Sequence, residues 1–364
     1  MQSLKDGFIE GYMKRVVVGM SGGVDSSVSA ALLKEQGYEV IGLHMKNANA
    51  SQETEDVLMA KGVCDKLGIK FVSMDYSDEM QTVKDYFISE YKQGRTPNPC
   101  VLCNREVKFK PFIDYANQIG ADYFATGHYA RVEHNGEVTK LLKGVDESKD
   151  QSYFLNQLSQ SQLGRAIFPL GEMTKVEVRK IAEEKGLVSA HKKDSFDVCF
   201  IGSQKFKDFM HKICPEKAGK IVDIESGKIV GKHEGLSAFT VGQRRGVGVG
   251  GQSNETGRWF VVRKDLQNNI LYISTNEKKY LFSKQIVVRR INWIPSLPEK
   301  KMFECCVKIR YRQADQKATV TLLDDTTAQI DFVEVQRAIA VGQYAVFYDG
   351  QQCLGGGVIE EVRY

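Results

Sequence analysis

The sequence predicts an α/β catalytic domain built on a doubly wound parallel sheet, then a small, mostly β central domain and a C-terminal antiparallel β-barrel. Three observations support this prediction. Strands and helices alternate early in the chain, short extended runs between glycines follow, and alternating strands with tight turns come last. Since 364 residues suffice for two or three domains, we place these at residues 1–208, 209–280 and 281–364.

The composition is that of a protein that folds in water. Hydrophobic residues make up 42% and charged residues 26% of the chain. A membrane span needs about 18 consecutive apolar residues, and no apolar run approaches that length. No apolar signal core precedes the first expected strand, so we expect a cytoplasmic protein without membrane contact. In that reducing compartment the eight cysteines are expected to be buried thiols, metal ligands or reactive groups.

Charge is unevenly distributed along the chain. The net charge is −2 over residues 1–205, +5 over 206–280 and +1 over 281–364. A basic middle segment indicates either an anionic partner or a solvated surface with a chance excess of charge, and charge alone does not separate these interpretations.

A loop with almost no side chains joins the first expected strand to the first helix. Three branched apolar residues, 16–18, predict a central parallel strand, and apolar residues at helical spacing over 24–32 predict the helix. Between them, Ser21–Gly23 allow backbone N–H groups to approach an anion closely, and Ser26 and Ser27 add hydroxyls at the positive end of the helix dipole. The loop therefore predicts a phosphate site.

This loop differs from the common nucleoside-triphosphate loop, which ends in Gly-Lys-Ser/Thr. The lysine position is acidic here, Val24-Asp25-Ser26, and an aspartate beside phosphates indicates a bridging Mg²⁺ ion. The alternative is a turn of small residues that binds nothing, although a bare turn does not need this composition. SGGVDSS resembles the pyrophosphate loop of the ATP-pyrophosphatase superfamily, whose members split ATP between its α and β phosphates and adenylate a carbonyl oxygen or an acid.

The other elements of the catalytic domain alternate regularly. The sequence predicts strands at 39–45, 70–76 and 123–126 and helices at 55–67, 78–93 and 104–118. In a doubly wound sheet, ligands bind beyond the carboxyl ends of the strands. Met45 and Gly127 follow or close two such strands, so we expect both to face the same crevice as the phosphate loop.

The remainder of the chain is predicted to be rich in β-structure. Short extended runs broken by glycines begin at about Gly219, and the pattern changes again near Gln285. Beyond that point, strands are expected at 305–311, 317–323, 328–333 and 344–348.

Two stretches contain cysteines that could be reactive thiols or metal ligands. Prolines fix an extended turn before a helix expected to begin at Asn104, so Cys103 should lie near a helix N-terminus, where the dipole favours thiolate. Alternatively, Cys100 and Cys103 are half of a zinc site, but the chain has no second C-x₂-C. Cys199 follows lysines and carboxylates, and taken alone it is better interpreted as a half-buried core thiol.

Several long segments together identify a family. SGGVDSS, GRTPNPCVLCNREVKF, ATGHYAR, KDQSYFL, KKDSFDVCFIG, TVGQRRGVGVGG, IRYRQ and CLGGGVIE occur in this order over the whole chain. They closely resemble the bacterial and mitochondrial tRNA-specific 2-thiouridylase family. The resemblance implies a catalytic domain of the adenine nucleotide alpha hydrolase type, a central domain and a C-terminal β-barrel. It also implies replacement of the 2-keto oxygen of the wobble uridine, position 34, by sulfur.

The resemblance implies a role for each site. ATP with Mg²⁺ would adenylate the uridine oxygen, and Cys199 would carry sulfur as a persulfide received from a donor protein, a cysteine desulfurase or a relay protein. Cys103 would be the nucleophile, releasing that sulfur as a disulfide forms with Cys199 or as hydrosulfide is set free. The matching ATP positions are Gly19, Met20, Ser21, Gly22, Gly23, Val24, Asp25, Ser26, Met45 and Gly127.

The resemblance also assigns contacts to tRNA, whose target base must leave the anticodon stack. Asn98, Pro99 and Cys100 match the segment that meets the base. The tRNA-binding positions are His128, Lys149, Asp150, Gln151, Arg310, Tyr311 and Gln343. Two of these have plainer alternatives: His128 as a hydrogen-bonded histidine at a strand end, and Tyr311 as a packed strand residue. Residues 243–246 in the basic segment are expected to meet the tRNA backbone.

The chain departs from the family in two places. Cys100 stands where aspartate is usual, so Cys100, Cys103 and Cys199 could instead form a three-cysteine set for an iron–sulfur cluster. The polar stretch after Met45 is short and lacks the acidic, aromatic insertion usual there.

Two other classes of function remain. A different carbonyl-activating enzyme, such as an amidating synthetase, would not need Cys103 and Cys199 together. A non-catalytic tRNA-binding protein would tolerate loss of Ser21 or Asp25.

Overall fold

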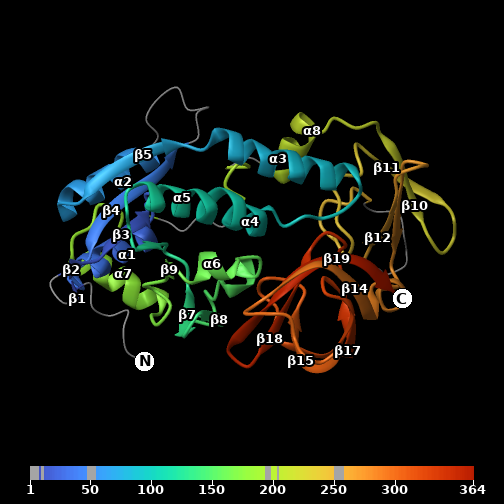
Figure 1. Ribbon diagram of the computed structural model, residues 1–364. Coiled ribbons are helices and arrows are strands. Elements are labelled where there is room, and N and C mark those ends of the chain that lie inside the picture. The colour runs from blue at the N-terminus through green and yellow to red at the C-terminus, as the bar shows by residue number, and fades with distance from the viewer. Residues whose placement is uncertain (1–7, 10–11, 47–54, 193–197, 203–204, 250–257) are drawn as a thin grey trace.

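The structure is a computed structural model that describes residues 8–9, 12–46, 55–192, 198–202, 205–249 and 258–364. Figure 1 shows a parallel sheet at one end of the molecule, a smaller sheet at the other, and a β-barrel beside the smaller sheet. No helix in the described ranges is long and apolar enough to cross a membrane.

A five-stranded parallel sheet forms the centre of the catalytic domain. Its strands, in spatial order, are β5 (Lys70–Asp75), β4 (Glu39–Lys46), β3 (Arg15–Gly19), β6 (Tyr123–Ala125) and β9 (Ala166–Ile167). The main helices are α1 (Val24–Glu35), α2 (Glu55–Leu67), α3 (Ser77–Lys92), α5 (Lys110–Gln118) and α7 (Lys175–Glu184). A short antiparallel pair, β1 (Phe8–Ile9) and β2 (Tyr12–Met13), precedes the sheet.

Helices cover both faces of this sheet, because successive strand residues point to opposite sides. Val17 packs with Phe112 of α5 on one face, whereas Val16 and Val18 pack with Leu33 of α1 and the apolar side of α2 on the other. All three valines are fully buried. The predicted doubly wound architecture is confirmed.

The helix expected at 104–118 begins earlier than predicted. The chain enters α4 (Pro99–Leu102), passes through a π-helical turn η1 (Cys103–Phe109) and continues into α5. Proline suits the first position of a helix because its ring presets φ and its missing N–H is not needed there. Cys103 therefore lies past the first turn of this helix, not at its N-terminus.

The chain between β6 and α7 contributes two strands to a different sheet. The hairpin of β7 (Ala130–Asn135) and β8 (Val138–Lys143) extends the barrel sheet, with Leu141 opposite Cys353 of β19. Short helices η2 (Ser152–Leu155) and α6 (Gln160–Leu163) follow. The sequence did not predict this link between the first and last parts of the chain.

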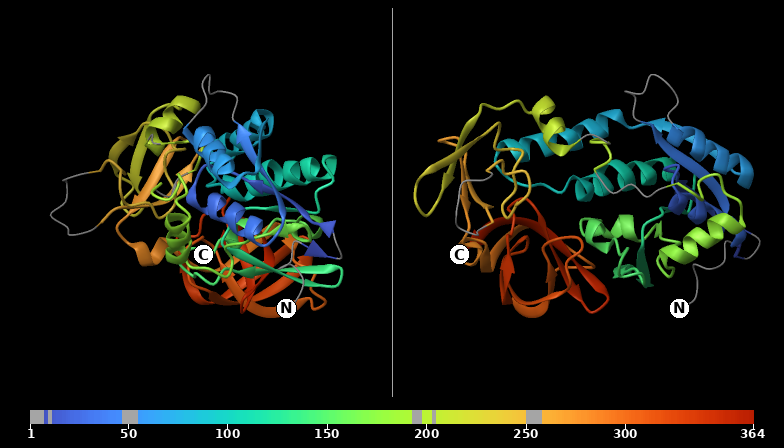
Figure 2. Two further views of the ribbon diagram at one scale, coloured as in Figure 1. Left: turned by 90° about the vertical axis from the view of Figure 1, so that its left-hand side faces the viewer. Right: turned by 180° about the vertical axis from the view of Figure 1, so that it is seen from behind.

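The central domain is a four-stranded sheet with the order β11-β10-β13-β12. Its elements are α8 (Phe206–Ile213), β10 (Gly219–Asp223), β11 (Ile229–His233), β12 (Phe260–Asp265), β13 (Ile270–Ser274) and α9 (Glu277–Tyr280). Figure 2 shows α8 lying against α3, where Phe87 packs with Phe209 and Met210.

The C-terminal domain is a closed barrel of six antiparallel strands. These are β14 (Phe282–Trp293), β15 (Met302–Lys308), β16 (Gln316–Asp324), β17 (Thr327–Arg337), β18 (Tyr344–Asp349) and β19 (Gln352–Arg363). Pairing of β14 with both β17 and β19 closes the barrel, so the predicted barrel is confirmed, with β14 and β19 in addition to the four expected strands.

Candidate active site

The phosphate loop is held in shape by its own hydroxyls. Ser26 Oγ and Ser27 Oγ donate to the carbonyl oxygen of Gly23 at 3.1 and 2.8 Å, and the backbone N–H of Ser21 donates to Ser26 Oγ at 3.2 Å. Gly23 is the N-cap of α1 and has no side chain to cap it. The loop thus presents the start of α1 to a ligand, as an anion site requires.

Two glycines permit close approach of backbone around this loop. Gly22 has φ +75°, and a Cβ there would lie 2.5 Å from the carbonyl oxygen of Asp56. A Cβ at Gly127 would lie 2.9 Å from backbone atoms of Asp25 and Ser26. Gly127, at the end of β6, is therefore packed directly against the loop, as the sequence predicted for a shared crevice.

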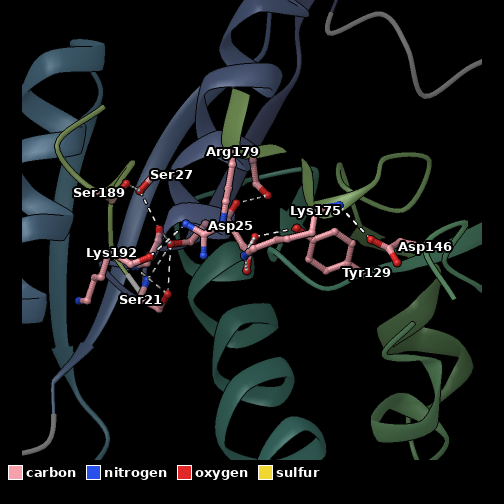
Figure 3. Close-up of polar contacts among 12 residues, drawn as sticks. Ser21, Asp25, Ser27, Tyr129, Asp146, Lys175, Arg179, Ser189 and Lys192 are labelled. Carbon is pink, nitrogen blue, oxygen red and sulfur yellow. Dashed lines mark hydrogen bonds and ion pairs between the residues drawn. The ribbon is translucent and has the colours of Figure 1, made fainter. Parts of the chain in front are cut away.

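The carboxylate of Asp25 is already engaged by a cation. Lys175 Nζ lies 2.7 and 2.8 Å from the two carboxylate oxygens, and Tyr129 Oη donates to Oδ1 at 2.8 Å (Figure 3). Lys175 is the first residue of α7 and is only 8% exposed. The sequence analysis missed it, since 150 residues separate the pair.

A second lysine reaches the loop from the segment that leads toward Cys199. Lys192 Nζ donates to the carbonyl oxygen of Gly22 at 3.3 Å and forms an ion pair with Asp56. Ser189 Oγ donates to Ser27 Oγ at 2.8 Å. Figure 3 shows Lys175 and Lys192 approaching the loop from opposite sides.

The structure brings the two expected catalytic cysteines into one region. Cys103 packs in an apolar cluster with Val83 and Val107, against which Phe200, the neighbour of Cys199, and Met45 also pack. Cys103 is 7% exposed, whereas Cys199 is exposed. The segment that contains Cys199 thus packs against the cluster that contains Cys103.

The expected thiolate at Cys103 is not what the structure shows. Burial raises the pKa of Cys103 to about 11, the nearby ammonium of Lys108 opposes this rise, and the thiols of Cys199 and Cys100 add to it. The prediction was wrong because the helix starts at Pro99, so the dipole, which acts within the first turn, is outweighed by desolvation.

Lys108 is a second residue that the sequence analysis missed. It is half buried in the π-helical turn that also holds Cys103, and its charge acts on Cys100, Cys103 and His128. π-Turns are frequent at functional sites. The signal in the sequence was the lysine five residues after Cys103, a spacing that an α-helix would not place on one face.

Cys100 and Cys199 both raise the pKa of Cys103, but the side chains of the three cysteines are not grouped as metal ligands in the described part of the structure. Among the residues that the structure describes, no three His, Cys, Asp or Glu side chains are grouped closely enough to hold a metal ion. Cys100, Cys103 and Cys199 all belong to the described part of the chain.

The expected target-base segment is docked on the barrel. Gln343 Nε2 donates to the carbonyl oxygens of Thr96 and Pro97 at 2.9 and 3.3 Å, and the N–H of Thr96 donates to the carbonyl of Val341 at 2.8 Å. Asn98 precedes α4 and Pro99 is its first residue. The Gln343 side chain therefore lies beside this segment and bonds to its backbone carbonyl oxygens.

The other expected tRNA positions either join two of the predicted segments or have side chains that bond within the protein. Tyr311 Oη donates to the carbonyl oxygen of Lys149 at 3.4 Å, and its ring packs on Phe154 at 4.4 Å between centroids, which joins two of the predicted segments. Asp150 is buried, and its carboxylate accepts bonds from Gly144 and Ser152, a structural arrangement.

Three more of these positions are bound within the protein. Gln151 Oε1 accepts the N–H of Tyr129 at 3.0 Å. Arg310 donates to the carbonyl oxygen of Ala338. His128 Nδ1 lies 2.8 Å from Thr126 Oγ1, and burial lowers its pKa well below the usual value. His128 is thus a neutral imidazole at the end of β6.

Comparison with known proteins covers the whole chain. The profile of the tRNA methyl transferase HUP domain matches residues 14–203, that of the tRNA methyl transferase PRC-barrel domain matches 207–275, and that of the aminomethyltransferase beta-barrel domain matches 283–359. The tRNA-specific 2-thiouridylase MnmA of Alkaliphilus oremlandii is 48% identical over 357 residues, which cover 96% of this chain and 97% of the relative. The protein of the same name in Bacillus cereus is 48% identical over 356 residues, covering 96% and 95%.

A solved structure, the U34-tRNA thiolase NcsA of Methanococcus maripaludis with its [4Fe-4S] cluster, matches with a TM-score of 0.36 and 21% identity over 56% of this chain and 67% of that one. This likeness is too slight to bear on the cofactor of this chain. Two of the profile descriptions name a methyl transferase, whereas the full-length relatives are thiouridylases, and the full-length likeness decides between them. The chain belongs to the tRNA-specific 2-thiouridylase family.

Proposed function

We propose that this enzyme adenylates the 2-keto oxygen of the wobble uridine of tRNA at its phosphate loop, and then replaces that oxygen with sulfur carried by Cys199 and released by Cys103. The observation that supports this most strongly is the packing of Phe200, next to Cys199, against the cluster of Cys103 and Met45. Met45 lies at the end of β4, beside the strand that leads into the phosphate loop.

In the first step, the uridine O2 attacks the α-phosphorus of ATP. The O2–Pα bond forms, the bond from Pα to the oxygen bridging to the β-phosphate breaks, and pyrophosphate leaves with the electron pair as the base gives up its N3 proton. The loop N–H groups and the start of α1 favour the negative charge that grows on the leaving group.

In the second step, sulfur displaces AMP. Attack by Cys103 on the Cys199 persulfide forms a Cys103–Cys199 disulfide and releases hydrosulfide, which adds to C2 and expels AMP. Alternatively, the terminal sulfur bonds to C2 first, and the disulfide then forms as the thiouridine is freed. Either route reduces the transferred sulfur and oxidises two thiols, so a cellular thiol reductant must reset the enzyme. Because burial raises the pKa of Cys103, we infer that Lys108 stabilises its thiolate during this step.

The loop residues fit the Mg²⁺ ion that accompanies ATP. Magnesium prefers oxygen ligands, and Asp25, Ser21 and Ser26 supply a carboxylate and two hydroxyls at the loop. The ion would neutralise charge on the phosphates.

An iron–sulfur cluster does not fit the donor set, because the three cysteines are not grouped as metal ligands. We therefore assign no step to a cluster. An anaerobic ultraviolet–visible spectrum of the freshly purified protein should lack cluster absorption, and a band that disappears in a Cys100→Ser variant would reverse this assignment.

We also propose the partners that the family resemblance implies. Lys149, Tyr311 and Gln343 lie in segments that contact one another or the segment before α4, so a tRNA lying over them would reach Asn98–Cys100. A persulfide donor protein would meet Cys199, which is exposed.

Separating the two steps tests this function. The Cys103→Ser variant should still release pyrophosphate from ATP in a tRNA-dependent manner yet form no 2-thiouridine, because only the second step needs the thiol. Asp25→Ala should lose both, and Cys305→Ser, in the barrel, should lose neither. Full thiolation by Cys103→Ser, or pyrophosphate release that ignores Asp25, would contradict the proposal.

A further inference from the structure

We propose that His44 is a positioning residue of the phosphate loop. Its imidazole holds the peptide between Met20 and Ser21 in the orientation that turns the N–H of Ser21 into the loop and the carbonyl oxygen of Met20 away from it. This inference rests on the proposed function, because it adds to the adenylation site a residue that acts through the loop backbone. It concerns how the loop is made ready for phosphates, and not the sulfur chemistry.

His44 reaches the loop from the neighbouring strand. It lies near the end of β4 and is 6% exposed, and its Nδ1 lies 2.7 Å from the carbonyl oxygen of Met20. Because a carbonyl oxygen can only accept, Nδ1 must carry a proton and donate it, which both the neutral Nδ1–H tautomer and the imidazolium can do. Burial of a polar ring is unfavourable unless its atoms are hydrogen-bonded. Here the bond goes to the backbone from which the loop begins.

Three consecutive residues of β4 hold Met20. A Cβ on Gly42 would lie 3.0 Å from Met20 Cγ, so the absence of a side chain makes room for that of Met20. The carbonyl oxygen of Leu43 accepts the N–H of Met20 at 2.8 Å, and His44 donates to the carbonyl oxygen of Met20. The paired register of β3 and β4 ends at Gly19 and Leu43. His44 therefore extends the hold of β4 one residue beyond the last strand pair.

The fixed carbonyl group sets the direction of the next N–H. In a trans peptide, the carbonyl oxygen and the N–H that follows point to opposite sides. With the oxygen of Met20 turned toward His44, the N–H of Ser21 points the other way and donates to Ser26 Oγ at 3.2 Å, in the first turn of α1.

The opposite orientation of this peptide would harm an anion site. A reversed peptide would present the carbonyl oxygen of Met20, in place of the N–H of Ser21, to the inside of the loop. Anion sites at helix N-termini depend on backbone N–H groups that converge on the ligand, and the partial negative charge of a carbonyl oxygen among them would repel a phosphate. His44 therefore favours the loop conformation that binds phosphate before the ligand arrives.

The alternative is a histidine that only completes the core. Phe71 lies beside the ring, with 6.3 Å between the two centroids, so His44 also fills space. The two roles differ in what a substitution must preserve. Packing needs a ring of similar size, whereas the positioning role needs a hydrogen-bond donor at the place of Nδ1.

Binding of pyrophosphate with Mg²⁺, measured by isothermal titration calorimetry, separates these roles without tRNA or sulfur. His44→Phe keeps a ring but lacks the donor, and should weaken binding about three- to tenfold, as expected for loss of a hydrogen bond. In His44→Asn the amide nitrogen is as many bonds from Cα as Nδ1 is, so this variant should keep most of the affinity. In His44→Gln that nitrogen is one bond further away, so binding should be as weak as in His44→Phe. His134→Phe, in the β7–β8 hairpin, is the control and should bind normally.

A measurement on the wild-type protein guards against variants that do not fold. In protein labelled with ¹⁵N-histidine, the ring resonances of His44 should show a protonated Nδ1 both before and after pyrophosphate binds. An unprotonated Nδ1, normal pyrophosphate binding by His44→Phe, or equal losses in His44→Asn and His44→Gln would each overturn the proposal. The proposed function is tested separately, since full thiolation by a Cys103→Ser variant would reject it whatever His44 does.

Discussion

At the scale of single residues, the nucleophile that we propose is a thiol whose pKa is raised by burial. Cys103 lies among apolar side chains, and burial raises its pKa to about 11. A buried thiol resists oxidation and stray alkylation, which would suit the proposed mechanism, in which the disulfide forms only after the base is adenylated.

The raised pKa of Cys103 predicts a steep pH dependence of its reactivity. Below pH 11 the thiolate is the minor form, so the rate of alkylation by iodoacetamide should rise about tenfold per pH unit from about pH 7 to about pH 9. Mass spectrometry of the Cys103 peptide measures this alkylation rate. Lys108→Met should slow the alkylation further. Lys110→Met, at an exposed position nearby, should leave the rate unchanged. A rate that stays flat over this range would mean a preformed thiolate.

Close packing at Gly127 predicts a second effect. In Gly127→Ala the new Cβ would lie 2.9 Å from the backbone of Asp25 and Ser26, so the loop must shift, at a cost of roughly 1–3 kcal/mol in stability. ATP affinity, measured by titration calorimetry, should fall. In Gly62→Ala, where the added Cβ meets nothing nearer than 3.6 Å, both quantities should stay close to those of the wild type, and equal behaviour of the two variants would contradict this account.

The sequence predicted residues that act locally better than residues that act across the chain. Ser21–Ser27 were identified because strand, loop and helix are contiguous, and the hydroxyls bond within the same few residues. Lys175 was missed because its partner is 150 residues away. Asp150 was expected to contact tRNA, but its carboxylate is used inside the protein, and a sequence does not show burial directly.

At the scale of elements, the turn before α4 is fixed from outside the catalytic domain. Arg95 forms hydrogen bonds to both carboxylate oxygens of Glu360 in β19 at 2.6 and 3.0 Å, and its Nε donates to Glu90 of α3 at 2.6 Å. The Arg95 side chain is 15% exposed. The barrel therefore positions the segment that leads to Cys103.

Weakening this ion pair should slow sulfur transfer more than ATP binding. Glu360→Gln removes one charge partner of Arg95 and should cost roughly 1–3 kcal/mol in the free energy of unfolding, measured by urea denaturation. Thiolation should fall while MgATP affinity, set at the distant phosphate loop, stays constant. Glu361→Gln, which loses only a surface pair with Arg363, is the control, and thiolation unaffected by Glu360→Gln would show that the barrel does not position this turn.

The sequence predicted whether a segment is a helix or a strand. It did not predict which sheet a strand joins, nor some of the element boundaries. The helix at 55–67 was predicted with the bounds that α2 shows, because its apolar spacing is regular. The start at Pro99 was missed, since the helix changes to a π-turn at Cys103 and the regular spacing is lost. The β7–β8 hairpin joins the barrel through two residue pairs with β19, and local alternation does not reveal which sheet a hairpin extends.

At the scale of the whole molecule, the central domain links the catalytic domain to the barrel. Phe209 and Met210 of α8 pack on α3, and Leu281 packs with Val262 and Ala338 at the barrel. The bounds proposed at residues 208 and 280 remain predictions. The excess positive charge of this domain fits contact with tRNA, which stays part of the proposal.

A buried lysine makes the stability of this assembly depend on pH. Burial lowers the pKa of Lys264 to about 8, and its Nζ donates to the carbonyl oxygen of Phe239 at 2.8 Å. Between pH 8 and the ordinary lysine value of 10.5 the unfolded chain binds a proton that the folded chain has released, so this residue's contribution to stability rises with pH across that window and is lowest below it.

The difference in unfolding free energy between wild type and Lys264→Met isolates this effect. The difference should shift in favour of the wild type from about pH 8 to about pH 10, as followed by urea denaturation. Lys278→Met, on an exposed neighbour of the paired Lys279, should give a difference that does not vary with pH. A pH-independent difference for Lys264→Met would show that its ammonium is not desolvated.

The central claim is that two cysteines distant in sequence act together on one adenylated uridine. Its most direct test is mass spectrometry of nucleosides from unmodified tRNA incubated with ATP, Mg²⁺, a persulfide donor and either the wild type, Cys103→Ser or Cys199→Ser. The account predicts 2-thiouridine at position 34 with the wild type and none with either variant. Wild-type levels of 2-thiouridine from either variant would contradict it.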